Sequence, residues 1–278
     1  MNYRHAYHAG NFADVLKHVV LLALLERLTA KGGAVFVLDT HAGRGRYPLA
    51  SPEADKGGEW RRGIGRILGL PEPPAAVAHY LARVAALGGG EKLTSYPGSP
   101  ALVLDALRPS DRAAFCELER GEAAALRRAL AGDGRAHVHE RDGYEALGAL
   151  LPPKETRGLV LIDPPYEAPE EFERLEAALV AAATRWREGV FAAWYPIVHG
   201  PAAARFLARM RDSGLRRQLL VELCIERDDS PVGLNGAGLL IVRPPWQLEL
   251  ALEPAVAWLH RALADGRGRA RVAWQVPE

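Results

Sequence analysis

A carboxylate, two prolines and a tyrosine follow directly after an apolar run in the segment GLVLIDPPYE, residues 158–167. The apolar residues 160–162 are typical of a buried strand, and Asp163 stands where that strand ends. Proline fixes the backbone angle φ and donates no backbone hydrogen bond. The sequence therefore predicts a stiff turn, rich in acceptors, that holds the ring of Tyr166 beside the Asp163 carboxylate.

Such a turn suits chemistry at an amino group on a nucleobase. The lone pair of that nitrogen is delocalised into the ring, so the nitrogen is a poor nucleophile. The Asp163 carboxylate and the Pro164 carbonyl could accept both of its hydrogens and localise the lone pair, while Tyr166 stacks on the base. We predict these residues as catalytic. A second copy, LLIVRPPW at 239–246, carries Arg243 in place of the acid, and we interpret that copy as structural.

Polar residues also follow the neighbouring predicted strands, and ligands of open α/β sheets bind at such strand ends. The first strand runs into DTHAGRG (39–45), the second ends on Glu117 and Glu119, and the third leads to Asp142 and Gly143. A dinucleotide fingerprint is broken, because Pro48 takes its third glycine position. A nucleoside cofactor without a pyrophosphate fits better, such as S-adenosylmethionine, with an acid at the second strand on its ribose and Asp142 on its adenine amino group.

The N-terminal segment YRHAYHAGNFADVLKH (3–18) holds a second polar group. Asn11 can cap the helix that follows, and Asp14, Lys17 and His18 share one face of its first turns. Tyr3, His5 and His8 precede the cap. The pattern indicates a lid or a cofactor clamp. Solvated structural polar groups are an alternative, and a metal site is a weaker one, because the three histidines come without a cysteine or a fixed set of four ligands.

Strand-like and helix-like stretches alternate along the chain, which predicts an α/β fold with a mostly parallel sheet to position these residues. Strands are predicted at 34–39, 113–119, 136–140, 158–163, 190–196, 218–226, 238–243 and 271–276, and helices at 12–30, 121–131, 170–187, 201–213 and 247–264. Only a polar loop joins 218–226 to 238–243, which predicts an antiparallel pair. The stretch 48–97 shows helical patterns at 59–69 and 75–87 and no strand, and it is predicted to be a helical insertion between the first and second strands.

Composition places the chain among globular proteins. It has 278 residues, of which 49% are hydrophobic and 25% charged, and we expect a single domain spanning 1–278. Cys116 and Cys224 lie in apolar runs and are expected to be buried thiols. No signal segment or membrane-length apolar run is visible, so we expect a cytoplasmic protein without membrane contact or an obligate protein partner. Net charge is only +1, but Arg61, Arg62 and Arg66 form a local basic cluster.

Several of these motifs together resemble the bacterial RlmJ family: YRHAYHAGNFADVLKH, LDTHAGRGRY, YPGSP, RDG, LIDPPYE, WYP and the ending WLHRAL…VAWQVPE. The resemblance runs from Asn2 to Glu278. It implies a Rossmann-like class I methyltransferase fold, with an antiparallel edge on the sheet, that methylates the N6 amino group of an adenine in large-subunit (23S) ribosomal RNA, using S-adenosylmethionine. By that resemblance the cofactor site would comprise Lys17, His18, His41, Ser99, Glu117, Asp142, Gly143 and Asp163. Tyr3 and His5 would lie near the substrate, with Tyr166.

Three other functions remain open on the sequence alone. A DNA adenine or cytosine amino-methyltransferase would use the same turn. The intact residues 163–166 disfavour a catalytically inactive RNA-binding module, and the broken glycine fingerprint disfavours an NAD-dependent dehydrogenase. An RNA substrate would be selected by loops and base stacking, with the reacting adenine flipped out of its stack, so a large net positive charge is not required.

Overall fold

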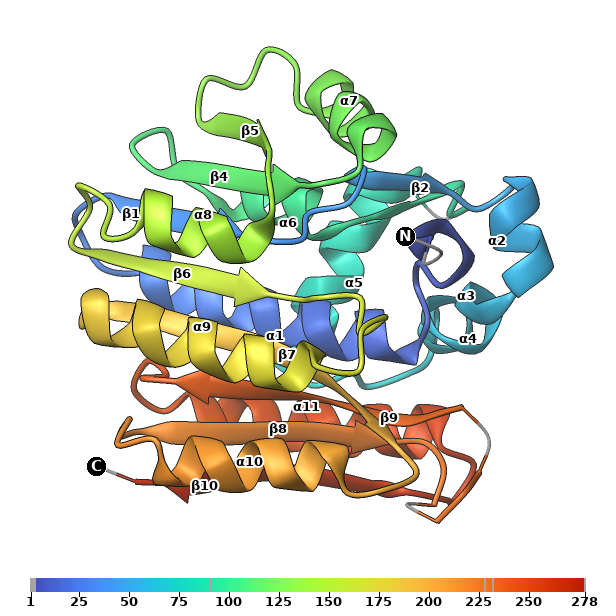
Figure 1. The fold of residues 1–278 in the computed structure, drawn as a ribbon. Helices are drawn as coiled ribbons and strands as arrows, with labels where there is room; N and C mark the ends of the chain where they lie inside the picture. Colours follow the sequence, from blue (N-terminus) through green and yellow to red (C-terminus); the bar gives the residue numbers. More distant parts are fainter. Residues whose placement is uncertain (1–3, 91, 228, 232, 278) are drawn as a thin grey trace.

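The computed structural model describes residues 4–90, 92–227, 229–231 and 233–277 (Figure 1). Within these residues the main sheet has eight strands in the order β10-β8-β9-β7-β6-β1-β4-β5. Its strands are β1 Val35–Asp39, β4 Arg112–Glu117, β5 Ala136–Glu140, β6 Arg157–Ile162, β7 Gly189–Val198, β8 Gln218–Cys224, β9 Leu234–Val242 and β10 Arg269–Val276. Each strand predicted from the sequence is present, and 136–140 has the predicted bounds, whereas the ends of the others differ by up to a few residues.

The sheet combines a parallel core with an antiparallel edge. Strands β5, β4, β1, β6 and β7 are parallel to one another, and their carboxyl ends therefore lie at one edge. β9 is antiparallel to both β7 and β8, and β10 is antiparallel to β8. The predicted pairing of 218–226 with 238–243 is confirmed, as is the Rossmann-like architecture with an antiparallel edge.

Helices cover both faces of the sheet (Figure 1). Two hydrophobic clusters, one on each face, contain the core side chains. On one face lie α1 Phe12–Thr29, α6 Ser99–Ala106, α7 Arg120–Ala129 and α11 Leu248–Leu263, and on the other lie α8 Gly143–Leu150, α9 Glu171–Arg185 and α10 Ala202–Asp212. Cys116 and Cys224 are both buried in the second cluster, as expected.

Helix α1 is buried along most of its length, between the sheet and helices α5 (Ala75–Gly88), α6 and α11. The Asn11 side chain caps it by accepting hydrogen bonds from the backbone amides of Ala13 and Asp14, both at 3.0 Å. Its ionisable residues Asp14, Lys17 and His18 are buried in the first two turns. No helix in the described ranges has the length and apolarity that crossing a membrane requires.

The inserted stretch between β1 and β4 corrects one expectation. It contains α2 Pro52–Gly57, α3 Glu59–Arg62, α4 Ile64–Ile67 and α5 Ala75–Gly88, flanked by the short strands β2 Arg46–Pro48 and β3 Ser95–Pro97. The prediction of no strand within 48–97 is therefore wrong, because β2 and β3 pair antiparallel at its base. The single helical pattern at 59–69 is interrupted at Gly63, where a Cβ atom would lie 2.2 Å from the Gly10 carbonyl oxygen.

Candidate active site

A cavity of about 1090 Å³ lies at the carboxyl ends of the parallel strands, between the start of α1, the β1–β2 turn and the turn after β6. Residues of the N-terminal segment, from Arg4 to Asn11, form part of its wall. The described residues that the sequence predicts for the catalytic, cofactor and substrate sites all line this cavity: His5, Lys17, His18, His41, Ser99, Glu117, Asp142, Gly143, Asp163, Pro164 and Tyr166. Tyr3 lies outside the described residues. The fold therefore brings together groups that are far apart in the sequence, such as Lys17 and Asp163, which are 146 positions apart.

Asp163 belongs to a series of ionisable groups that leads back into α1. Its carboxylate lies 2.6 Å from the Lys17 ammonium, which also lies 2.8 Å from Asp14. The second Asp14 oxygen accepts a hydrogen bond from the backbone amide of Gly10, at 2.9 Å, and lies 3.0 Å from the His5 ring. One buried cation is thus shared by two carboxylates, and Asp163 is the more exposed of them.

Burial and charge act in opposite directions within this series. Burial alone would raise the pKa of the Asp14 carboxyl, but the charges of His5 and Lys17 outweigh it and hold that pKa well below its usual range. Burial alone would lower the pKa of the Lys17 ammonium, but Asp14 and Asp163 outweigh it and raise that pKa well above its usual value. Lys17 and Asp14 are therefore both charged at neutral pH.

The two prolines after β6 lead to a ring that is held from two sides. The Tyr166 hydroxyl donates a hydrogen bond of 2.8 Å to the Trp194 carbonyl, and its ring centroid lies 4.8 Å from that of Phe172 and 5.7 Å from that of Trp194. Tyr166 has a φ of 51°, which an L-residue adopts only when its surroundings impose it. Both prolines and Tyr166 line the cavity with Asp163, so the orientation of the tyrosine ring there is fixed.

The end of β1 supplies a buried acid and a neutral histidine. Asp39 accepts a hydrogen bond of 2.7 Å from the Ser99 hydroxyl, and burial raises the pKa of this carboxyl to about 6, against the effect of Ser99. Burial also lowers the pKa of His41 to about 4. The Nδ1 atom of His41 lies 2.8 Å from the Thr40 hydroxyl, so at neutral pH this histidine offers an uncharged ring to the cavity.

Glu117 ends β4 and is fixed by two backbone amides. Its carboxylate oxygens accept hydrogen bonds from Gly43, at 2.9 Å, and from Glu119, at 2.8 Å. Gly43 has a φ of +61°, and a Cβ atom there would lie 2.1 Å from the Tyr47 hydroxyl, so only glycine fits. Glu119 itself caps α7 through the amides of residues 121 and 122. Of the two acids predicted at this strand end, Glu117 lines the cavity with a fixed carboxylate, and Glu119 also has a structural role.

Asp142 has structural partners that the sequence did not reveal. It caps α8 by accepting hydrogen bonds from the amides of Tyr144 and Glu145, and its second oxygen lies 2.8 Å from the Arg174 guanidinium. At Gly143 a Cβ atom would lie 2.2 Å from the Thr40 carbonyl oxygen, which excludes any side chain. These contacts fix the Asp142 carboxylate beside the cavity. Its Oδ1 atom already accepts from two amides, whereas Oδ2 accepts only from Arg174 and keeps a lone pair that a ligand could use.

The three histidines of the N-terminal segment do not converge. His5 lies beside Asp14, the Nδ1 atom of His8 lies 2.9 Å from Glu59, and that of His18 lies 2.7 Å from the Tyr96 hydroxyl. Among the described residues, no group of three or more His, Cys, Asp or Glu side chains is placed to hold a metal ion. The Nε2 atom of His18 is buried and has no hydrogen-bond partner within the described ranges, and His18 lines the cavity.

Two residues of the inserted stretch were missed from the sequence: Glu59 lines the cavity, and Tyr96 contacts the lining residue His18. The Glu59 carboxylate lies 2.9 Å from the His8 ring and accepts a hydrogen bond of 2.9 Å from the Asn11 side chain. Tyr96, in the motif YPGSP, contacts His18. A signal for Tyr96 existed, because that motif contains the predicted site residue Ser99. Nothing local to Glu59 indicates its partners, which lie 51 and 48 positions away.

The second strand that runs into two prolines and an aromatic residue is structural, as predicted. Arg243 stands in the position of the acid, and its guanidinium donates hydrogen bonds of 3.0 Å to the carbonyls of Ala183, Trp186 and Gly189. β9 is antiparallel to β7, so this turn lies at the opposite edge of the sheet from Asp163.

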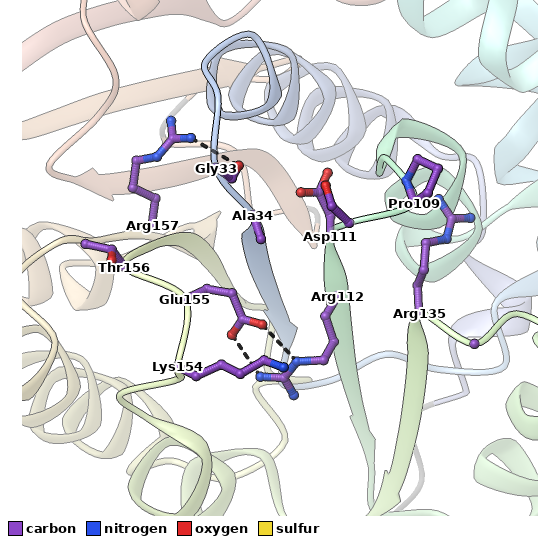
Figure 2. Close-up of a pocket in the computed structure, with 12 residues that line it drawn as sticks. Gly33, Ala34, Pro109, Asp111, Arg112, Arg135, Lys154, Glu155, Thr156 and Arg157 are labelled. Carbon is purple, nitrogen blue, oxygen red and sulfur yellow. Dashed lines mark hydrogen bonds and ion pairs between the residues drawn. The ribbon is translucent and has the colours of Figure 1, made fainter.

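That opposite edge also carries an open hollow of about 870 Å³ at the amino ends of β1, β4 and β6 (Figure 2). Its guanidinium groups already have partners: Arg112 pairs with Glu155, Arg135 with Asp133, and Arg157 with backbone carbonyls at the end of α1. Because these arginines pair with acids or with backbone carbonyls of α1 and the loop after it, we interpret the hollow as a structural contact between α1 and the sheet and assign it no catalytic role.

Comparison with known proteins gives concordant matches over nearly the whole chain. Residues 32–276 match the family described as "Ribosomal RNA large subunit methyltransferase D, RlmJ". Proteins named ribosomal RNA large subunit methyltransferase J from Haemophilus influenzae and Escherichia coli K12 are each 38% identical over 100% of both chains. The crystal structure of a protein from Legionella pneumophila, 32% identical, superposes with a TM-score of 0.88 over 96% of this chain and 98% of that one.

Proposed function

This chain belongs to the RlmJ family of ribosomal RNA large subunit methyltransferases, and we propose that it transfers a methyl group from S-adenosylmethionine to the N6 amino group of an adenine in large-subunit ribosomal RNA. The proposal rests on one observation. Asp163, in its rigid turn, lines the same cavity as the strand-end acids Glu117 and Asp142. The proposal includes one domain over 1–278, with an inserted subdomain at 48–97.

The groups that line the cavity fit the proposed cofactor. Glu117 ends β4 with fixed carboxylate oxygens that can accept from ribose hydroxyls, and Asp142, after the adjacent strand β5, can accept from the adenine amino group. The Nε2 atom of His18, which has no partner in the described part of the chain, would provide a further polar contact. Bound S-adenosylmethionine supplies an electrophilic methyl group on a sulfonium centre.

The residues of the chain would act mainly by positioning and by accepting hydrogen bonds. The Asp163 carboxylate and the Pro164 carbonyl would accept the two hydrogens of the target amino group, while Tyr166 packs against the base. Lys17 pairs with Asp163 and fixes one of its oxygens at 2.6 Å, which leaves the other available to the substrate. Correct orientation of two reactants can remove roughly 7–11 kcal/mol of a bimolecular barrier.

The decisive test of the substrate compares two nucleic acids. With labelled S-adenosylmethionine, the protein should methylate a ribosomal RNA fragment that contains its target and leave duplex DNA of mixed sequence unlabelled. Mass spectrometry of the digested RNA should find N6-methyladenosine. Efficient methylation of the DNA would favour the alternative, a DNA amino-methyltransferase, and would leave the chemistry at Asp163 intact.

Cofactor affinity should depend on the two strand-end acids. Glu117→Ala removes a hydrogen-bond acceptor, and we expect S-adenosylmethionine to bind about tenfold or more weakly, as for a hydrogen bond to a charged group. Asp142→Asn is the sharper variant at the second position, because asparagine can still cap α8. Calorimetry should show weaker binding in both variants. Unchanged affinity in both would mean that the cofactor site is elsewhere.

RNA affinity should depend on the arginines of the inserted stretch. Arg61 pairs with Asp55, and Arg66 pairs with Asp265, but exposed pairs of this kind are weak, so these guanidinium groups can exchange partners. Replacing Arg61, Arg62 and Arg66 with alanine should weaken RNA binding. The salt slope of binding should fall by about 0.7 for each RNA phosphate that an arginine no longer neutralises.

The matched control for this change is Lys154→Ala, a lysine in the hollow at the opposite edge of the sheet. It should leave both RNA affinity and the salt slope unchanged. Cofactor affinity should be the same in the triple variant and in the control. If Lys154→Ala weakens RNA binding as much as the triple variant does, the RNA is not bound specifically through the insertion.

A further inference from the structure

A buried series of hydrogen bonds connects the inserted stretch to the cavity. The hydroxyls of Tyr80, on α5, and Tyr96, on β3, lie 3.0 Å apart, and the Tyr96 hydroxyl lies 2.7 Å from the Nδ1 atom of His18, on α1. The relative exposure of these residues is 0% for both tyrosines and 1% for His18. The Tyr96 and His18 rings are stacked, with centroids 5.5 Å apart. These three side chains therefore depend on one another for their hydrogen bonds.

The far end of the series sets the direction of its hydrogen bonds. Within the part of the chain that the structure describes, the Tyr80 hydroxyl has Tyr96 as its only hydrogen-bond partner. If His18 donated from Nδ1 to Tyr96, and Tyr96 donated to Tyr80, the Tyr80 hydrogen would be buried without an acceptor, at a cost of about 1–3 kcal/mol. In the opposite direction Tyr80 donates to Tyr96 and Tyr96 donates to His18, so every hydroxyl hydrogen is satisfied.

This direction determines which nitrogen of His18 carries its proton. An Nδ1 atom that accepts from Tyr96 leaves the single proton of a neutral imidazole on Nε2. Burial lowers the pKa of His18 to about 3, so the ring is neutral at physiological pH. The Nε2 atom is buried, has no partner among the described residues, and belongs to a residue that lines the cavity. The ring therefore offers a ligand one uncharged N–H donor in a fixed direction.

The order of the strands indicates which end of a ligand would meet this donor. Glu117 ends β4 and Asp142 follows β5, so the proposed ribose and adenine contacts lie on the β4–β5 side of the cavity. His18 follows Lys17, whose ammonium contacts Asp163 after β6, on the other side of β1. The end of the ligand that extends away from the nucleoside would thus lie nearest to His18.

We propose that Tyr96, whose hydroxyl is oriented by Tyr80, is a positioning residue that holds His18 in its Nε2–H tautomer, so that His18 donates a hydrogen bond to the carboxylate of S-adenosylmethionine. This inference rests on the proposed function, because it assumes that cofactor. It gives the insertion a role in cofactor binding in addition to RNA contact. A purely structural role of the two tyrosines would require only their rings, and phenylalanine would replace them without consequence for the ligand.

The first experiment measures the tautomer of His18 in the cofactor-free protein by nitrogen-15 NMR. The wild type should show the Nε2–H form. Tyr96→Phe should lose this fixed form, because Nδ1 then has no hydroxyl from which to accept. Tyr80→Phe should keep it, because the Tyr96 hydroxyl hydrogen still requires the Nδ1 acceptor. An Nδ1–H tautomer in the wild type would overturn the proposal, and it would do so without any measurement on a variant.

The second experiment measures affinity by calorimetry, with S-adenosylmethionine and decarboxylated S-adenosylmethionine as probes. Tyr96→Phe should weaken binding of the first by about five- to tenfold, the worth of one hydrogen bond, and leave binding of the second unchanged. Tyr80→Phe should have the same pattern with a smaller loss. The matched control is Tyr195→Phe, which removes another fully buried hydroxyl, bonded to Glu222 at 2.8 Å; it should alter neither affinity.

The outcomes separate this inference from the proposed function. Equal losses for both probes would mean that His18 meets another part of the cofactor and would overturn the carboxylate assignment. Unchanged affinity and tautomer in Tyr96→Phe would reduce the tyrosines to packing. If the wild type binds neither probe, the proposed cofactor is wrong and the carboxylate assignment falls with it, whereas an Nε2–H signal that is lost in Tyr96→Phe would still establish Tyr96 as a positioning residue.

Discussion

Replacing Asp163 with asparagine should reduce the rate of methyl transfer by roughly 30- to 1000-fold, which corresponds to a loss of about 2–4 kcal/mol of transition-state stabilisation. The amide keeps the size of the side chain but removes the negative charge that would accept hydrogen from the target amino group. Lys17 would remain paired with Asp14 at 2.8 Å, so no isolated charge is left in the core. The rate should be measured in single turnover, with RNA and S-adenosylmethionine both saturating.

Cofactor binding is the control for this variant. Asp163 is also a predicted cofactor contact, but Glu117, Asp142 and His18 line the same cavity and stay unchanged. Affinity for S-adenosylmethionine should therefore fall by much less than the rate. A variant that retains a near-wild-type rate would exclude the role that we assign to Asp163, and a loss of affinity as large as the loss of rate would reduce Asp163 to a binding residue.

The framework could be predicted because its signals are local. Short apolar runs mark each parallel strand, and amphipathic stretches between them require a crossover helix. The loop between β8 and β9 is polar and has no helical pattern for a crossover, which indicates the antiparallel pair. β2 and β3 escaped prediction, because they have three residues each and Tyr47 pairs with Tyr96, far away in the sequence.

Much of the candidate site could also be predicted, because the carboxyl ends of parallel strands must meet at one edge of the sheet. Asp163 and Glu117 were found in this way, and Lys17 and His18 were found from their shared helix face. The partners of these residues could not be found. Lys17 reaches Asp163 across 146 positions and His18 reaches Tyr96 across 78, and no local pattern encodes such a contact.

Acids at strand ends were harder to interpret, for a physical reason. In an α/β unit the strand end is followed at once by the start of a helix, so one carboxylate can face a ligand or cap the helix. Asp142 caps α8 and Glu119 caps α7, whereas Glu117 accepts from a backbone amide of the β1–β2 turn. All three are carboxylates at the end of a strand, and only the structure separates their uses.

Removing the buried cation should have the largest effect on stability. In Lys17→Met the carboxylates of Asp14 and Asp163 lose the ammonium that lies within 2.8 Å of both. Asp14 is only 2% exposed, so its charge would keep only the His5 ring and the Gly10 amide as the partners named above. Breaking a buried ion pair in this way typically costs about 3–5 kcal/mol. Urea unfolding at neutral pH should show a loss of that size in the free energy of unfolding.

The pH dependence of this loss tests its electrostatic origin. In the wild type the pKa of Asp14 is held well below its usual range, so its contribution to stability is present above the unfolded pKa of about 4 and is lost as the pH falls through the lower folded pKa. In Lys17→Met burial is opposed mainly by His5, and the folded pKa of Asp14 should rise. The variant is then destabilised at neutral pH and relieved as the carboxyl takes up a proton, so the difference from the wild type should narrow as the pH falls toward about 4.

A double variant separates charge from packing. Asp14→Asn combined with Lys17→Met removes the cation together with the buried anion, and the asparagine oxygen can still accept the hydrogen bond from the Gly10 amide. This double variant should be more stable at neutral pH than Lys17→Met alone, and its stability relative to the wild type should change less between about pH 4 and 7. If both variants lose the same free energy at every pH, the loss comes from the packing of the methionine, and Lys17 does not hold Asp163 in place by charge.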